Sequence, residues 1–257
     1  MEKSRKVNKG FYLSFLVLPL CAFGPLEVRA EEIGGHIISR LEQKALATQS
    51  YKASFDLLMR IGGNEFTLTG VTLYKWPKML RVEMSLRDQK ELSQVLYLKD
   101  GAAWQYLPMV KVAFHRDEEA LRKKFPDTYA SQELLNIQDP FDLVESKTVK
   151  FLDEERTGKG TTYLFEGIPK QAIQHQGVLT PTLCRMRIAE QDGLLRDLVM
   201  YDATGREILK QHFWDIQQNL DLLEEEFVFK PEDVKLVEVT QETEKKMRLF
   251  LEKESPQ

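Results

Sequence analysis

The stretch YKASFDLLMRIGGNEFTLTGVTLY, residues 51–74, decides the fold of this 257-residue chain. Between Tyr51 and Ile61 apolar side chains alternate with mostly polar ones, which is the pattern of a strand with one buried face. Gly62-Gly63-Asn64 then supplies a tight turn, and 65–74 predicts a second strand. The stretch therefore predicts an antiparallel β-hairpin.

The same alternation continues along the chain after this hairpin, broken by short turns such as Asp100-Gly101 and Thr204-Gly205. Short strands that follow one another this closely pair as an antiparallel meander. The further predicted strands are 80–86, 91–99, 103–107, 110–115, 147–155, 161–167, 183–189, 194–201, 207–217 and 227–239, the last interrupted at Pro231.

Helical patterns occur at three places. Residues 32–47 have apolar side chains at helical spacing, so an amphipathic helix precedes the hairpin. Residues 117–146 interrupt the strand rhythm and predict two or three short helices, with Asp117, Ser131 and Asp139 as candidate N-caps. The charged segment 243–253 predicts a frayed helix or a tail.

The first 30 residues have the three parts of a secretory signal peptide. Basic residues precede an apolar run from Phe11 to Phe23, and the run ends near the small-residue site at Ala30. The run is shorter than the roughly 20 residues that span a bilayer, and Pro19 interrupts it, so a membrane anchor is the weaker interpretation. We expect cleavage after Ala30 and a periplasmic product.

Cys21 leaves an alternative open, in which the chain is a lipoprotein acylated at this cysteine. Lipobox sequences place a small residue directly before the cysteine, whereas Leu20 stands here. No repeat and no Gly/Ser linker divides the rest of the chain. The expected organisation is a signal peptide over 1–30, one domain over 31–242 and a charged tail over 243–257.

The composition excludes several classes of function. Removal of 1–30 leaves 31 basic and 38 acidic residues, a formal charge of −7, whereas nucleic-acid binding is usually accompanied by strong positive charge. We therefore expect no nucleic-acid partner. Only Cys184 then remains, so no intramolecular disulfide can form. The apolar core of the remaining chain must hold the fold unaided, and its length is sufficient for that.

No catalytic constellation is recognisable. The four histidines are scattered, without metal-ligand spacing, and the motifs of phosphate loops, dinucleotide sites and serine nucleophiles are absent from the sequence. Cys184 lies in a strand pattern without a candidate base, so a buried thiol is the better interpretation. We therefore expect no enzyme activity, no cofactor and no metal site.

The inward sides of the predicted strands carry large, adaptable side chains, which could line a lipid pocket. An ordinary packed core explains the same periodicity, and the pattern by itself favours that core. The candidate pocket residues are Phe55, Leu57, Met59, Trp76, Leu80, Val82, Met84, Trp104, Tyr106 and Phe114.

A family resemblance favours the pocket. Five segments, in this order, resemble the periplasmic lipoprotein carrier (LolA) family. They are SYKASF (50–55), GVTLYKWPKMLRVEM (70–84), DGAAWQYLP (100–108), DATGREILKQHF (202–213) and FVFKPEDVKLVEV (227–239). The resemblance spans most of residues 32–239.

The resemblance implies an α+β fold: a curved antiparallel sheet forming an incomplete β-barrel, covered by an N-terminal helix and short lid helices that enclose an apolar cavity. It also implies a carrier that takes the acyl chains of lipoproteins from the inner to the outer membrane. In the family a basic residue before the motif's proline holds the lid. Here Trp76 stands before Pro77, and Lys75 precedes it, so both are candidate lid contacts.

The expected partners are an acylated lipoprotein or lipid cargo, an inner-membrane transporter and an outer-membrane acceptor, with the carrier itself a monomer. A second hypothesis is a sensor or regulatory module that uses the same barrel to recognise envelope lipids or a partner protein, because fold does not determine function. A third, an envelope hydrolase, lacks a catalytic group.

Overall fold

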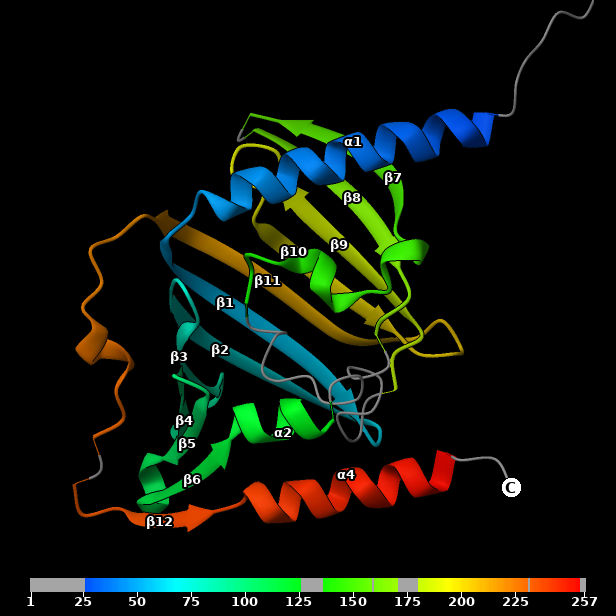
Figure 1. Ribbon diagram of the computed structural model, residues 1–257. Helices are drawn as coiled ribbons and strands as arrows, with labels where there is room; N and C mark the ends of the chain where they lie inside the picture. The colour runs from blue at the N-terminus through cyan, green and yellow to red at the C-terminus, as the bar shows by residue number, and fades with distance from the viewer. Residues whose placement is uncertain (1–25, 126–135, 159, 171–179, 231, 255–257) are drawn as a thin grey trace, which may run out of the picture.

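The computed structural model of the chain describes residues 26–125, 136–158, 160–170, 180–230 and 232–254. Twelve strands form one sheet, in the order β12-β6-β5-β4-β3-β2-β1-β11-β10-β9-β8-β7. Because β12 and β7 are the two ends of this order, the sheet is not closed. Figure 1 shows it strongly curved, with helices across it, so the predicted incomplete barrel is confirmed.

The strands have the following bounds: β1 Ser50–Ile61, β2 Asn64–Lys75, β3 Met79–Leu86, β4 Gln89–Lys99, β5 Ala102–Leu107, β6 Val112–Asp117, β7 Lys150–Thr157, β8 Gly160–Gly167, β9 Leu183–Ala189, β10 Leu195–Tyr201, β11 Glu207–Gln218 and β12 Lys235–Glu238. Neighbours pair in antiparallel fashion except β12, which is parallel to β6. The β1–β11 pair joins the two halves of the chain.

The last predicted strand, 227–239, is mostly wrong. Of its described residues, only Lys235–Glu238 form a strand, and a 3₁₀ helix, η5, lies before it at Glu224–Phe227. The reason is topological: β11 ends beside β1, and the chain must cross the sheet before it can pair with the distant edge strand β6. Residues 219–230, which make this crossing, are called the strap below.

Helix α1, Leu26–Leu46, crosses the sheet at the β7–β10 end (Figure 1). Leu41 and Ala45 on α1 are buried in the core, as the amphipathic pattern predicts. The β9–β10 turn fits directly beneath the helix, where a Cβ atom built on Gly193 would lie 2.1 Å from the Leu41 carbonyl oxygen. Only glycine permits this approach, which also requires a positive φ of 73°.

The described residues between β6 and β7 form α2, Glu118–Lys124, and the 3₁₀ helices η3, Pro140–Leu143, and η4, Ser146–Thr148. Asp117 caps α2 by accepting a hydrogen bond from the Ala120 amide, as predicted. Asp139 precedes η3 without a side-chain capping bond, and the predicted cap Ser131 lies outside the described residues.

Residues 136–149, here called the covering segment, lie on the same face of the sheet as α1 (Figure 1). The Ile137 carbonyl accepts a hydrogen bond from the Leu195 amide, and Phe141 meets Phe165 edge to face at 5.2 Å. Leu143 and Val144 are fully buried. This face, called the inner face, therefore carries the main core.

The opposite, outer face of β3–β5 is covered by the strap. Phe229 packs against Tyr97, Trp104 and Tyr106, with ring centroids 5.2–5.6 Å apart. Arg81 donates a hydrogen bond to the Glu226 carbonyl oxygen. Apolar side chains of these strands are therefore covered on the outer face too, whereas the inner face of β5 includes the exposed Gln105.

At the lower edge of Figure 1, α4, Thr240–Glu254, lies beside α2. It follows β12 and begins where Thr240 accepts a hydrogen bond from the Asp117 amide. Among the described residues, no helix combines the length and apolarity needed to cross a membrane.

Candidate functional site

Seven of the ten predicted pocket residues point to the inner face. Cross-strand pairing places Phe55 opposite Gly70, which in turn pairs with Met84, so their side chains share one side of the sheet. Most of this set is packed shut rather than open. The buried members are Phe55, Leu57, Leu80, Val82 and Met84, and the partly buried ones are Met59 and Phe114.

Two of the predicted pocket residues lie on the wrong face. Trp104 pairs with Tyr97 and His115, and Tyr106 pairs with Val95, which places both aromatic rings on the outer face. There they contact Phe229 of the strap. The prediction chose the aromatic side of β5 as the inward side, whereas the inward positions are those of Ala103 and Gln105.

The two candidate lid contacts, Lys75 and Trp76, lie on different sides of the sheet. Lys75 is on the outer face, where its ammonium donates a hydrogen bond to the Leu222 carbonyl oxygen of the strap at 2.7 Å. The prediction that it contacts a lid is therefore wrong, because strand alternation turns it away from the inner face. Trp76 follows β2, is 55% exposed, and lines a cleft at the end of the inner face.

This cleft has a volume of about 240 Å³ and lies between the β2–β3 turn, α1, α2 and the covering segment. Its apolar lining is Leu46, Tyr74, Trp76, Pro77, Leu80 and Leu98, and its polar lining is Lys78, Arg122, Asn136, Gln138, Asp139 and Asp142. The volume is below the roughly 300–1,000 Å³ of typical drug-sized pockets. The cleft is thus smaller than a complete ligand chamber, and the inner-face side chains of Tyr74, Leu80 and Leu98 form part of its wall.

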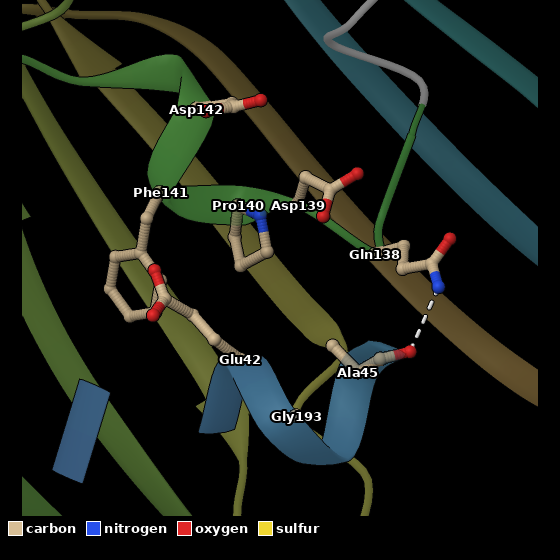
Figure 2. A pocket seen from close by; sticks show the side chains of 8 residues that line it. All are labelled: Glu42, Ala45, Gln138, Asp139, Pro140, Phe141, Asp142 and Gly193. Carbon is tan, nitrogen blue, oxygen red and sulfur yellow. Dashed lines mark hydrogen bonds between the residues drawn. The ribbon is translucent and has the colours of Figure 1, made fainter. Parts of the chain in front are cut away.

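The end of the covering segment is attached to the sheet and to α1 by polar contacts. The Tyr51 hydroxyl accepts a hydrogen bond from the Ile137 amide and lies 3.2 Å from Asn136 Oδ1. Gln138 donates from Nε2 to the carbonyl oxygens of Ala45 and Thr48, both at 2.8 Å. Figure 2 shows the bond to Ala45. Burial raises the pKa of the Tyr51 hydroxyl, which stays protonated.

A smaller hollow of about 80 Å³ adjoins the cleft and shares three of its residues, Gln138, Asp139 and Asp142 (Figure 2). Glu42 of α1 also lines it. Partial burial, and then the charges of Asp142 and Asp139, raise the pKa of Glu42. The pKa of Asp139 is raised by burial and by Asp142, against a hydrogen bond from Asn136. Carboxyl repulsion therefore acts between α1 and the covering segment.

The groups at the site are an apolar wall and several charged side chains. In the described ranges, no group of three or more His, Cys, Asp and Glu side chains is placed so that it could hold a metal ion. Cys184 is buried, and burial raises the pKa of its thiol to about 12. The cleft joins an apolar wall to charged groups, which suits an amphiphile.

Several residues of the site could not be chosen from the sequence. Tyr74 and Leu98 follow the predicted strand alternation. Their place on the inward side of that alternation is the one sequence signal for including them in the site. Gln138 and Asp139 belong to an irregular segment, whose place in the fold depends on tertiary contacts alone. They carry no sequence signal beyond the candidate cap.

Comparison with known proteins gives matches in structure alone. The sequence matches no established family and no curated protein. An uncharacterised conserved protein from Thermus thermophilus has a similar structure, with 14% identity, a TM-score of 0.54, and coverage of 79% of this chain and 98% of that one. The chain shares that protein's fold.

Weaker likenesses include a LolA superfamily protein from Nitrosomonas europaea, with 11% identity, a TM-score of 0.36, and coverage of 76% of this chain and 97% of that one. MucB in the MucA/MucB complex of Pseudomonas aeruginosa has 13% identity, a TM-score of 0.44, and coverage of 77% and 61%. The fold of this chain is an open, mostly antiparallel sheet with covering helices. Identities this low concern the fold alone.

Proposed function

We propose that the chain is a periplasmic carrier that binds the acyl chains of lipoproteins against its inner face and moves them from the inner to the outer membrane. The observation that supports this best is the apolar inner face of an open sheet, which is reached through the cleft beside Trp76. Leaving acyl chains in water costs roughly 0.8 kcal/mol per CH₂, so a carrier must supply apolar surface.

The inner face is filled by the protein's own side chains, so acyl chains must displace part of the cover. The covering segment suits this role because its first residues are held by hydrogen bonds to Tyr51, Ala45 and Thr48, which a ligand can exchange. Its apolar anchors, Leu143 and Val144, lie further along the segment. We propose that the cover opens from the cleft.

Uptake of a fluorescent fatty acyl probe tests this proposal. Trp76→Ala removes an exposed ring at the entrance and should lower probe affinity about tenfold with little change in Tm, because burying a large apolar side chain contributes about 1.5–3 kcal/mol. Met109→Ala, which removes an apolar side chain that is also more than half exposed but lies elsewhere, is the control and should leave affinity unchanged.

Failure of the native protein to take up the probe would contradict the proposal, as would unchanged affinity in the Trp76 variant.

Mass spectrometry of protein isolated from its own envelope should also detect lipid or lipoprotein. N-terminal sequencing of that sample tests cleavage after Ala30. Cleavage there would leave the rest of α1 attached to the domain.

A second proposed function, recognition of a partner protein by a sensor module, is favoured by one surface feature. Met109 and Val110 in η1, Pro108–Val110, and Leu236 of β12 are each more than half exposed, and β12 pairs alongside the strand that follows η1. Met109→Glu should abolish capture of a specific envelope protein without reducing acyl-probe uptake. Loss of probe uptake alone, in Trp76→Ala, would instead favour the carrier.

A further inference from the structure

The charged residues that line the cleft are separated by sign. The basic ones are Lys78, on the β2–β3 turn, and Arg122, on α2. The acidic ones are Asp139 and Asp142, which both belong to the covering segment. The cleft therefore has a basic side and an acidic side, next to one apolar wall.

The acidic side continues into the smaller hollow. Glu42 of α1 lines this hollow with Asp139 and Asp142, and none of the described residues that line it is basic. Figure 2 shows the three carboxylates coming from two elements, α1 and the covering segment. Asp142 forms an exposed ion pair with Lys170 at 3.5 Å, whereas Glu42 and Asp139 form none with the described residues. The negative charge at this place is therefore poorly compensated.

A hydrogen-bond acceptor at the same place lacks a donor. Gln138 lines both the cleft and the hollow, and it is 2% exposed. Its Nε2 donates to the carbonyl oxygens of Ala45 and Thr48, but its Oε1 accepts no hydrogen bond from the described residues. Figure 2 shows Oε1 pointing away from Ala45. An unpaired buried acceptor destabilises the folded state, so this end of the cover gains from an N–H donor when it opens.

The carboxylates and Oε1 of Gln138 are all acceptors, so the complementary ligand group is one that only donates. A primary ammonium has three N–H donors and no acceptor, and its charge offsets the repulsion between the carboxylates. A metal ion fits less well, because acidic side chains in the described part of the chain are not grouped so that they could hold one. We propose that the cleft recognises an amphiphile with a zwitterionic head group, whose primary ammonium lies against Asp139 and Asp142 and whose anionic group faces the basic side.

The sizes of the two spaces agree with this arrangement. The hollow, of about 80 Å³, exceeds the roughly 10–15 Å³ that one water needs, so it has room for an ammonium group. The cleft, of about 240 Å³, suits a head group, while the acyl chain continues past Tyr74, Leu80 and Leu98. The inference rests on the proposed function, because the inner face takes the acyl chain, and it adds the head group that the carrier prefers.

Three lysophospholipids with the same lauroyl chain test the preference: lysophosphatidylethanolamine, lysophosphatidylcholine and lysophosphatidylglycerol. Each is titrated, below its critical micelle concentration, against native protein loaded with a fluorescent acyl probe, and displacement gives its affinity. We expect the ethanolamine lipid to bind about fivefold more tightly than the glycerol lipid, which has no positive charge, because exposed ion pairs contribute modestly. The choline lipid keeps the charge without an N–H, so it should bind about twofold to threefold more weakly than the ethanolamine lipid.

Asp139→Asn combined with Asp142→Asn assigns the preference to the covering segment. Both substitutions keep the shape of the side chain and remove its charge, so the variant should bind the ethanolamine and glycerol lipids within about twofold of each other. Glu91→Gln combined with Glu145→Gln is the matched control. It changes the net charge equally, at two exposed positions outside the cleft lining, and should keep the preference of about fivefold.

Binding of the glycerol lipid by the native protein as tightly as the ethanolamine lipid would overturn the inference, as would a preference that survives in the Asp139/Asp142 variant. Equal binding of the choline and ethanolamine lipids would overturn the assignment of a primary ammonium. If the double variant does not fold, Asp139→Asn alone replaces it, and the three lipids on native protein still decide. Failure of the acyl probe to bind at all counts against the proposed function instead, whereas a bound probe that none of the lipids displaces counts against the inference.

Discussion

Single residues show how tightly the inner face is packed. A Cβ atom built on Gly70 of β2 would lie 2.2 Å from the Glu83 carbonyl oxygen and 2.8 Å from Cζ of Phe55. The absent side chain leaves room for the Phe55 ring, which is fully buried. Gly70 is therefore required by packing, not by its backbone angles.

Gly70→Ala should destabilise the protein by about 2–3 kcal/mol, because the backbone of β3 has no space to move without breaking its pairing. Urea unfolding measures the change. Gly35→Ala is the control: nothing lies within 4 Å of its Cβ position in α1, so it should be neutral or stabilise by up to about 1 kcal/mol. Similar effects of the two substitutions would contradict this account of the inner face.

Cys184 gives a second prediction at this scale. Burial raises the pKa of its thiol to about 12, so the reactive thiolate is scarce at neutral pH. We expect a thiol reagent to leave Cys184 of the mature, native protein unmodified over hours and to modify it within minutes in denaturant. Fast modification of the native protein would show that the inner face opens frequently without ligand.

Among the elements, the contact between α1 and the covering segment responds to pH. The pKa values of Glu42 and Asp139 are raised in the folded state, so the folded protein binds protons more readily than the unfolded chain. The contribution of these groups to stability is therefore greatest at low pH and falls as pH rises from about 4 through their raised pKa values.

Glu42→Gln removes one of these charges and should raise Tm at neutral pH by about 1–2 °C, since partly exposed charges interact weakly. The gain should shrink as pH approaches 4, where the native carboxyl is protonated. Differential scanning calorimetry across this range measures it. Glu145→Gln, an exposed position of the same segment, should show no such dependence, and an equal effect there would point to net charge instead.

The strap affects how the alternation of side chains in β2–β5 can be interpreted. Because Phe229 and Leu222 cover the outer face of β2–β5, apolar side chains are buried on both sides of these strands. Alternation identifies the inward side only where the other side is solvated. This is why Trp104 and Tyr106 were assigned to the wrong face.

At the scale of the whole molecule, one sheet forms the framework of the domain. Helix α4 lies at its edge and makes few contacts with it. It contacts α2 and β6, through Lys124 with Glu244 and through the Asp117 amide with Thr240. A chain ending at Glu242 keeps the second contact. We expect one cooperative thermal transition and a fall in Tm of less than about 3 °C, because exposed ion pairs contribute little.

A fall in Tm several times larger than this, or a second transition, would mean that the tail is part of the domain. Far-UV circular dichroism provides the control, since the only loss expected is that of one exposed helix. The same measurement tests the predicted division of the chain at 242.

The sequence by itself determined most of the strands, their antiparallel pairing and most of the inner face, because side chains of a half-buried strand alternate with a period of two whatever surrounds it. The open barrel was what the family resemblance implied. Tertiary structure alone decided the rest. It assigned the faces of β5, turned Lys75 to the strap, and built the cleft from the irregular covering segment. These features depend on which distant segment covers each face, and short-range periodicity carries no information about that partner.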